Sequence, residues 1–388
     1  MTFLRNTQVA NLPTNPLRRI FEQAKPGMTN LASGHPNPVY CDHRGLEVAT
    51  ALAAKEQRSW RYGASAGDAE LIDALPPWQA PVGGASTLVT SGAQQGIFLA
   101  CQCLGAPGQT ILVPDPVYPA VLSVAVLLGV KVRTYCGESP ATALQDLARL
   151  MQGHDDICAV YVLPTFSNPT GETWRSEDRD ALLELCAQSK VAVIEDDPYR
   201  ELWFDAKPPE RLIERAASLG LTTEVLSLGS LSKIVAPGLR IGWIQGNPDL
   251  IAAMTAARQA MDLQPNALAQ RVACHYLQSG ALERHLNHLR PQYASAHATL
   301  TAPLRAAGFS RLKVHGGMFV MPELPSGISV AGLAEHLRSH ELLVAPGDAF
   351  SIDKSRPSNR LRLCFAALPP ADLHRAGETL VAAVEAWR

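Results

Sequence analysis

The chain has 388 residues, a formal net charge of −2 at pH 7 and 47% hydrophobic residues. This length exceeds one typical hydrophobic core, so we expect two domains. The basic residues are scattered rather than clustered, which argues against nucleic acid as a partner, and no apolar run is long enough to span a bilayer.

The cysteines and the first residues indicate the cellular setting. The eight cysteines include Cys101-x-Cys103, but they form no paired CxxC and no metal-like Cys/His spacing. We therefore expect reduced thiols, no bound metal and a cytoplasmic location. Residues 1–11 lack a basic start followed by an apolar stretch, so we expect no signal peptide.

Apolar, strand-like runs alternate with helical segments between about Leu88 and Gln245. This alternation predicts a mostly parallel sheet with helices on both faces. After the first run, Leu88–Val89, the small residues Thr90–Gly96 lead into an apolar stretch at helical spacing, Ile97–Leu104. Free amides at such a helix start suit a phosphate, although Ser-Gly turns also open many helices without a ligand.

The next two strand-like runs are also followed by polar or aromatic side chains. Tyr118 follows Ile111–Val113 and is either a flat shelf for a planar ring or a packed core tyrosine. Asn168 follows Ala159–Leu163, and the proline after it favours an extended or turn conformation. Its amide would lie beyond the strand's carboxyl end, where ligands bind in open α/β sheets, although a plain turn is the alternative.

An acid and a tyrosine follow the run Val191–Ile194. Asp196 could pair with a buried ring nitrogen and keep it protonated, and Tyr199 could donate to a neighbouring oxyanion. Acids are also common caps at strand ends, so this segment alone is ambiguous.

Lys233 follows Val225–Leu228, with Ser230 and Ser232 before it and Arg240 after it. A lysine beside hydroxyls and a cation can lose its proton near neutral pH and attack an aldehyde. The arginine and hydroxyls would suit a phosphate dianion. The segment therefore indicates a lysine that binds a phosphorylated aldehyde, with an exposed loop as the alternative.

Long helical segments follow Gly246, and the one at Leu282–Ala296 is expected to bridge to a smaller domain. We expect a large domain over residues 45–285 and a small domain over 1–44 and 286–388. The strands expected in the small domain are Lys313–Val320, Leu342–Ala345 and Leu361–Phe365.

The order and spacing of these segments resemble the fold-type I pyridoxal-phosphate enzymes, specifically the class I/II aminotransferases and their 2-aminoadipate, aromatic and branched-chain branch. The resemblance covers nearly the whole chain, and its further segments are Ser33–Pro36, Tyr62-Gly63, Gly316–Phe319, Ala345–Gly347 and Leu361–Leu363. It implies an α/β fold, with a mostly parallel seven-stranded sheet in the large domain and a smaller α+β domain. It also implies a homodimer with shared active sites.

The resemblance further implies roles for single residues. Lys233 would carry the aldimine with pyridoxal 5'-phosphate and move the substrate's α-proton, while Asp196 would hold the pyridine nitrogen protonated. Arg362 would bind the substrate α-carboxylate through two parallel hydrogen bonds. Gly34, which lacks a side chain, would let the backbone approach the same carboxylate. The remaining cofactor contacts would be Tyr118 on the ring face, Asn168 and Tyr199 at the phenolic oxygen, and Gly92, Ala93, Gln94, Ser230, Ser232, Arg240 and the partner subunit's Tyr62 at the phosphate.

The chain departs from the family pattern at two positions. Val39-Tyr40-Cys41 stands where an aromatic-proline pair is usual, and Ala93 offers no hydroxyl to a phosphate. A second arginine for a substrate side-chain carboxylate is not evident. Arg18 or Arg19 is a candidate, although both fit solvated helix charges better.

The expected reaction is transfer of an amino group from an L-amino acid to a 2-oxo acid. A lyase, cyclase or oxidase with the same cofactor shell is the alternative. Regulators that carry this fold need about a hundred more N-terminal residues for a DNA-binding winged helix, and here the fold is expected to start almost at Met1.

Overall fold

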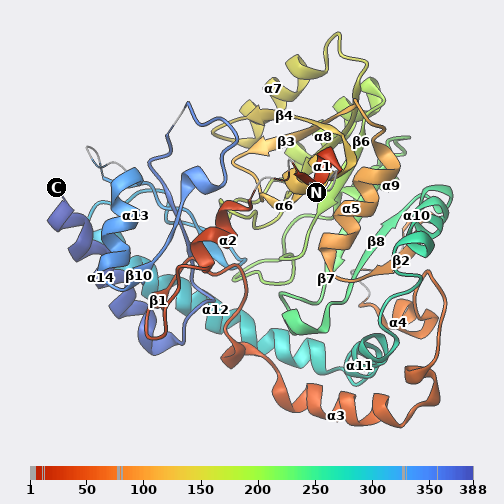
Figure 1. Ribbon diagram of the computed structural model, residues 1–388, viewed down its shortest axis with the longest axis horizontal. Helices are drawn as coiled ribbons and strands as arrows, with labels where there is room; N and C mark the ends of the chain where they lie inside the picture. Colours follow the sequence, from red (N-terminus) through yellow and green to blue (C-terminus); the bar gives the residue numbers. More distant parts are fainter. Residues whose placement is uncertain are drawn as a thin grey trace, which may run out of the picture.

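The structure, a computed structural model, describes residues 6–10, 12, 14–76, 79, 82–325, 328, 330–355 and 357–387. A seven-stranded sheet with the order β2-β8-β7-β6-β5-β3-β4 forms the larger part (Figure 1). Its strands are β2 (Ser86–Thr90), β3 (Thr110–Asp115), β4 (Lys131–Cys136), β5 (Ile157–Val162), β6 (Ala192–Asp196), β7 (Val225–Ser230) and β8 (Gly242–Gly246).

This sheet is mostly parallel, as predicted, because only β8 runs antiparallel to its neighbours β2 and β7. Its inner strands are apolar on both faces, as parallel sheets covered by helices require. Ile194 packs with α5 (Ala93–Leu104), α6 (Ala120–Leu128) and α10 (Pro248–Met261). Val193 packs with α7 (Pro140–Met151), α8 (Ser176–Ser189) and α9 (Leu212–Ser218) on the other face.

Two small sheets form the second part of the fold. β9 (Phe319–Val320) and β11 (Ala345–Pro346) pair antiparallel with β12 (Leu361–Cys364), while β1 (Thr29–Asn30) pairs parallel with β10 (Leu342–Leu343). The β1–β10 pair therefore joins the start of the chain to its last third. The domain boundaries at 44/45 and 285/286 stay a prediction.

The expected strand Lys313–Val320 is wrong over most of its length, since only its last two residues are in a strand. The reason lies at Gly316 and Gly317, which pack tightly against Phe166. Gly317 has a φ of +78°, and this left-handed conformation turns the backbone before β9 begins.

The long helix α12 (Ala281–Ala306) runs between the two parts and packs against α14 (Pro370–Trp387) (Figure 1). It contains the predicted helix Leu282–Ala296. The other helices are α1 (Thr7–Ala10), α2 (Pro16–Phe21), α3 (His43–Lys55), α4 (Ala69–Ala74), α11 (Ala267–Gln278) and α13 (Val330–Ser339). Within the described ranges, no helix combines the length and the apolar character needed to cross a bilayer.

Candidate active site

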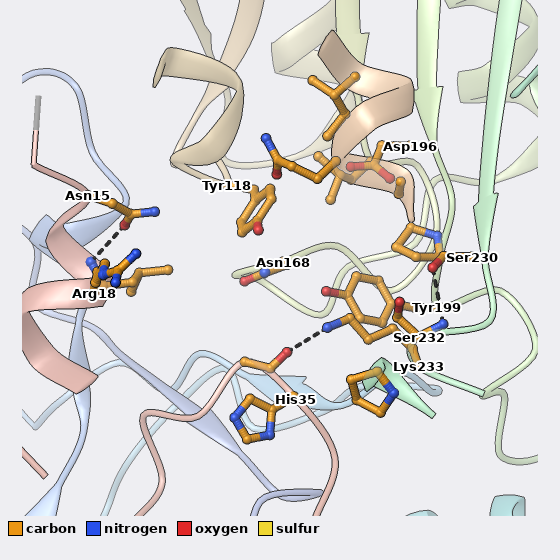
Figure 2. Close-up of a pocket in the computed structure, with 18 of the residues that line it drawn as sticks. Asn15, Arg18, His35, Tyr118, Asn168, Asp196, Tyr199, Ser230, Ser232 and Lys233 are labelled. Atoms are coloured by element: carbon orange, nitrogen blue, oxygen red, sulfur yellow. Dashed lines mark hydrogen bonds between the residues drawn. The ribbon is translucent and has the colours of Figure 1, made fainter. Parts of the chain in front are cut away.

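A cavity of about 670 Å³ lies where the carboxyl ends of β6 and β7 face α2, the segment after β1, and β12 (Figure 2). Open α/β sheets bind ligands at this edge. The predicted site residues that line it are Gly34, Ala93, Gln94, Tyr118, Asn168, Asp196, Tyr199, Ser230, Ser232, Lys233, Arg240 and Arg362. The fold thus gathers side chains that are spread over more than 300 positions of the sequence.

Lys233 lies just beyond β7 and projects into this cavity, where its Nζ donates a hydrogen bond to the Gly34 carbonyl at 2.8 Å (Figure 2). Burial lowers the pKa of this amine to about 8, and the positive charges of Arg362 and Arg240 act in the same direction. Desolvation is thus a larger cause of the lowered pKa than the hydroxyls and the cation expected from the sequence. At pH 7 roughly a tenth of the amine is therefore uncharged, far more than for an ordinary lysine.

The start of α5 and Arg240 form a cradle suited to a phosphate. Gly92 is the N-cap residue with a φ of +77°, and no side chain caps the amides of the first turn. Arg240 donates to the Ser91 carbonyl at 3.0 Å and to Ser232 Oγ at 3.3 Å. The positive φ favours glycine at position 92, and a Cβ there would lie 2.9 Å from the Arg240 Cζ, so the guanidinium would have to shift.

Asp196 is the last residue of β6, and only 3% of it is exposed. Its Oδ2 accepts a hydrogen bond from the Tyr161 hydroxyl at 2.6 Å, whereas its Oδ1 has no partner among the described residues. Burial raises the pKa of this carboxyl to about 6. An unpaired, buried acceptor at the cavity wall calls for a donor from a ligand, and a protonated ring nitrogen would meet that need.

Tyr118, Asn168, Asp196, Tyr199 and Lys233 all line this cavity, and Asn168 lies beside Tyr199 (Figure 2). Burial raises the pKa of the Tyr199 hydroxyl, and the Asn168 side chain contacts it. The Tyr199 ring packs edge-on against Phe319 at 5.6 Å between centroids. Burial also raises the pKa of the Tyr118 hydroxyl. The hydroxyls of Tyr118 and Tyr199 thus stay protonated near neutral pH and can donate hydrogen bonds to a ligand oxygen.

Arg362 on β12 is fully buried between the rings of Phe319 and Phe350, which lie 4.6 and 4.9 Å from its Cζ. Its guanidinium donates to Asn168 Oδ1 at 3.2 Å and to the carbonyl oxygens of Ala32 and Ser33. Burial lowers the pKa of this group to about 10, and its Nε has no partner among the described residues. The side chain is therefore a fixed cation with a donor left for a ligand anion.

Several candidate residues lie elsewhere. Tyr62 is 86% exposed and does not line the cavity. Arg360, two residues before Arg362 and the other arginine that could bind the α-carboxylate, bonds instead to Glu138 at 3.0 Å, outside this cavity. Arg18 lines the cavity mouth, but its Nε pairs with Glu22 Oε1 at 3.3 Å. Arg19 does not line it, so only one of the two arginines of α2 is near the site.

Two groups of residues were not predicted from the sequence. Tyr161 contacts Asp196 from the neighbouring strand, and no local pattern marks it, because β5 is apolar on both faces. Part of the outer wall of the cavity is formed by α2 and its flanking residues, namely Asn15, Leu17, Phe21 and Glu22. No local motif pointed to them, because their position depends on how the start of the chain folds back.

Comparison with known proteins identifies the class. The family model "Aminotransferase class I and II" matches residues 26–380, so this chain belongs to that family. The aromatic-amino-acid aminotransferase 1 of Thermococcus litoralis is 30% identical over 80% of this chain and 76% of its own. The 2-aminoadipate transaminase of Thermus thermophilus is 30% identical over 89% of this chain and 87% of its own.

Solved structures agree with this assignment. A kynurenine aminotransferase of Pyrococcus horikoshii in complex with PMP superposes with a TM-score of 0.90 and 27% identity, covering 99% of this chain and 97% of its own. The protein is thus an aminotransferase that uses pyridoxal phosphate to move an amino group between an amino acid and a 2-oxo acid. The expected reaction is confirmed, and the lyase, cyclase and oxidase alternatives are not favoured.

Proposed function

We propose that pyridoxal phosphate binds in this cavity with its phosphate at the start of α5 and its ring nitrogen at Asp196. The observation that carries the proposal is the unpaired, buried Asp196 Oδ1 in the same cavity as Lys233. Gly92, Ala93, Gln94, Ser230, Ser232 and Arg240 would hold the phosphate. When bound, this cofactor supplies an electron sink for bonds at the substrate Cα.

The chain's own groups would then share the remaining work. Lys233 Nζ would bind the cofactor and then carry the substrate's α-proton between Cα and the cofactor, a role that suits an amine with a pKa of about 8. Tyr199 and Asn168 would hold the cofactor's phenolic oxygen, while Tyr118 would cover the ring. Asn168 also contacts Arg362, so it would link the cofactor to the substrate carboxylate.

Arg362 is proposed to bind the α-carboxylate beside Gly34, because its guanidinium is buried, fixed and short of one partner at Nε. The α-carboxylate is common to all amino donors. We therefore expect Arg362→Lys to lower kcat/KM roughly tenfold to a hundredfold for every donor, because lysine keeps the charge but cannot form paired, planar hydrogen bonds. Steady-state rates of 2-oxo acid formation with a panel of neutral, aromatic and acidic amino acids would measure this loss.

Arg360→Lys is the matched control, since Arg360 lies just before β12, two residues from Arg362, but bonds to Glu138 at 3.0 Å outside the cavity. We expect at most a twofold change for this variant, typical of a partly exposed ion pair. A large effect at Arg360, or a loss at Arg362 confined to acidic donors, would refute this orientation of the substrate.

We propose that the enzyme is a homodimer in which Tyr62 reaches the partner's phosphate site. The exposure of the segment supports this: Tyr62 is 86% and Trp60 64% exposed, and Val48 and Leu52 of the adjacent α3 are also exposed. Neighbouring exposed apolar side chains of this size are typical of an interface. We also propose a cytoplasmic location, because the eight cysteines form no paired CxxC or other disulfide-like spacing in the sequence.

A mixing experiment tests the shared site. Tyr62→Ala and Lys233→Ala subunits should each be nearly inactive alone, whereas hybrids should regain one intact site because the two lesions fall in the same site. Random mixing should restore about a quarter of wild-type activity, since half of the dimers are hybrids with one of two sites intact. Rates would be measured after denaturation and refolding of the mixture. No recovery in hybrids verified by native mass spectrometry would place Tyr62 outside the partner's site.

A further inference from the structure

Tyr161 and Asp196 are brought together by the register of two parallel strands. Tyr161 on β5 pairs with Ile194 on β6, and both side chains pack into the same core layer. Asp196 is two residues beyond Ile194, so its side chain points to the same face of the sheet. The tyrosine ring extends toward the carboxyl end of the sheet and its hydroxyl meets Asp196 Oδ2 at 2.6 Å.

We propose that Tyr161 is a positioning residue, whose hydroxyl holds the Asp196 carboxylate charged and leaves Oδ1 directed at the ring nitrogen of the cofactor. This inference rests on the proposed role of Asp196. Tyr161 is fully buried and does not line the cavity, so it acts only through the carboxylate. The packing of the ring alone would be satisfied by phenylalanine, so the hydroxyl carries the effect.

The electrostatics around the pair support this role. Burial raises the pKa of Asp196 to about 6, the Asp197 charge acts in the same direction, and the Tyr161 hydrogen bond and Lys233 oppose them. The other titratable groups that face Tyr161 are Tyr118 and Tyr199. Loss of the hydroxyl would therefore favour the neutral carboxyl, which cannot hold a pyridinium proton.

Tyr161→Phe is expected to lower the pH at which the ring nitrogen of the bound cofactor loses its proton by at least about one unit. The ¹⁵N chemical shift of cofactor labelled at this nitrogen reports the protonation state directly in the holoenzyme. Affinity of the apoenzyme for pyridoxal phosphate should fall about tenfold, and kcat should fall more than KM rises. Tyr161→His, which retains a ring N–H donor, should recover part of the shift.

Tyr135→Phe is the matched control. Tyr135 is equally buried, but its hydroxyl donates to the Tyr161 carbonyl at 3.2 Å and its ring packs on the opposite face of the sheet. Both substitutions remove one buried hydroxyl and should lower the thermal midpoint comparably. Only the Tyr161 variant should move the ¹⁵N titration. Equal loss of stability with an unchanged titration in both variants would make Tyr161 a packing residue and overturn the inference.

Asp196→Asn separates this inference from the proposed function on which it rests. If Asp196 holds the ring nitrogen, Asp196→Asn shifts the titration strongly, and Tyr161→Phe adds nothing in that background because the charge is already gone. If Asp196→Asn leaves the titration unchanged, the proposed role of Asp196 fails. A shift with Asp196→Asn but none with Tyr161→Phe would refute the role of Tyr161 alone.

Discussion

Lys233→Ala should lower turnover by more than about 10⁴-fold, because it removes the amine proposed both to bind the cofactor and to move the α-proton. The fold should survive. The amine makes one hydrogen bond, to the Gly34 carbonyl at 2.8 Å, and burial disfavours its charge, so its removal costs little stability. Single-turnover formation of 2-oxo acid and a thermal melt would measure the two effects.

Lys207→Ala is the control, because Lys207 is exposed and does not line the cavity. We expect wild-type rates for it. Borohydride reduction of the wild-type holoenzyme followed by peptide mass spectrometry should place the pyridoxyl group on Lys233. A pyridoxyl group on another lysine would overturn the assignment of the whole site.

Asp196→Ala should reduce kcat by roughly 10²- to 10³-fold, whereas the neighbouring Asp197→Ala should keep most of the activity. Only Asp196 lines the cavity with an unpaired oxygen. A charge opposite the ring nitrogen acts mainly in the transition state, so kcat should fall more than KM rises. Parallel measurements of kcat, KM and thermal midpoint on both variants would separate catalysis from folding.

Asp197 is also buried, but its Oδ2 accepts from Arg200 at 3.4 Å outside the cavity. Its loss leaves Arg200 without this partner, so Asp197→Ala should lower the thermal midpoint instead. Comparable losses of kcat at both positions would show that the wrong carboxylate had been assigned to the ring nitrogen.

The sequence allowed the sheet and most of the cavity wall to be predicted because the information there is local. Polar side chains directly after apolar runs mark strand ends, and parallel strands bring those ends to one edge. Lys233, Asp196 and Asn168 were found in this way. The strand ends themselves were less accurate, since Glu195 and Asp196 lie within β6 rather than after it.

Features that depend on distant contacts could not be predicted. Tyr161 reads as one more apolar residue of a buried strand until the register with β6 is known. The pKa of Lys233 depends mainly on how far the folded protein excludes water from the amine. The hydroxyls and cation near it in the sequence do not indicate that burial. The part of the cavity wall that α2 forms depends on how the N-terminal segment folds back across the molecule.

The pairing of β1 with β10 also orders events during synthesis of the protein. Thr29 leaves the ribosome more than 300 residues before its partner Leu342. The carbonyls of Ala32 and Ser33, which hold Arg362, must wait for that residue to be translated. The large sheet has all its strands by Gly246 and can form earlier. A nascent chain can therefore form the proposed phosphate site long before the proposed carboxylate site at Arg362, so we expect amino-acid binding only after translation has passed β12.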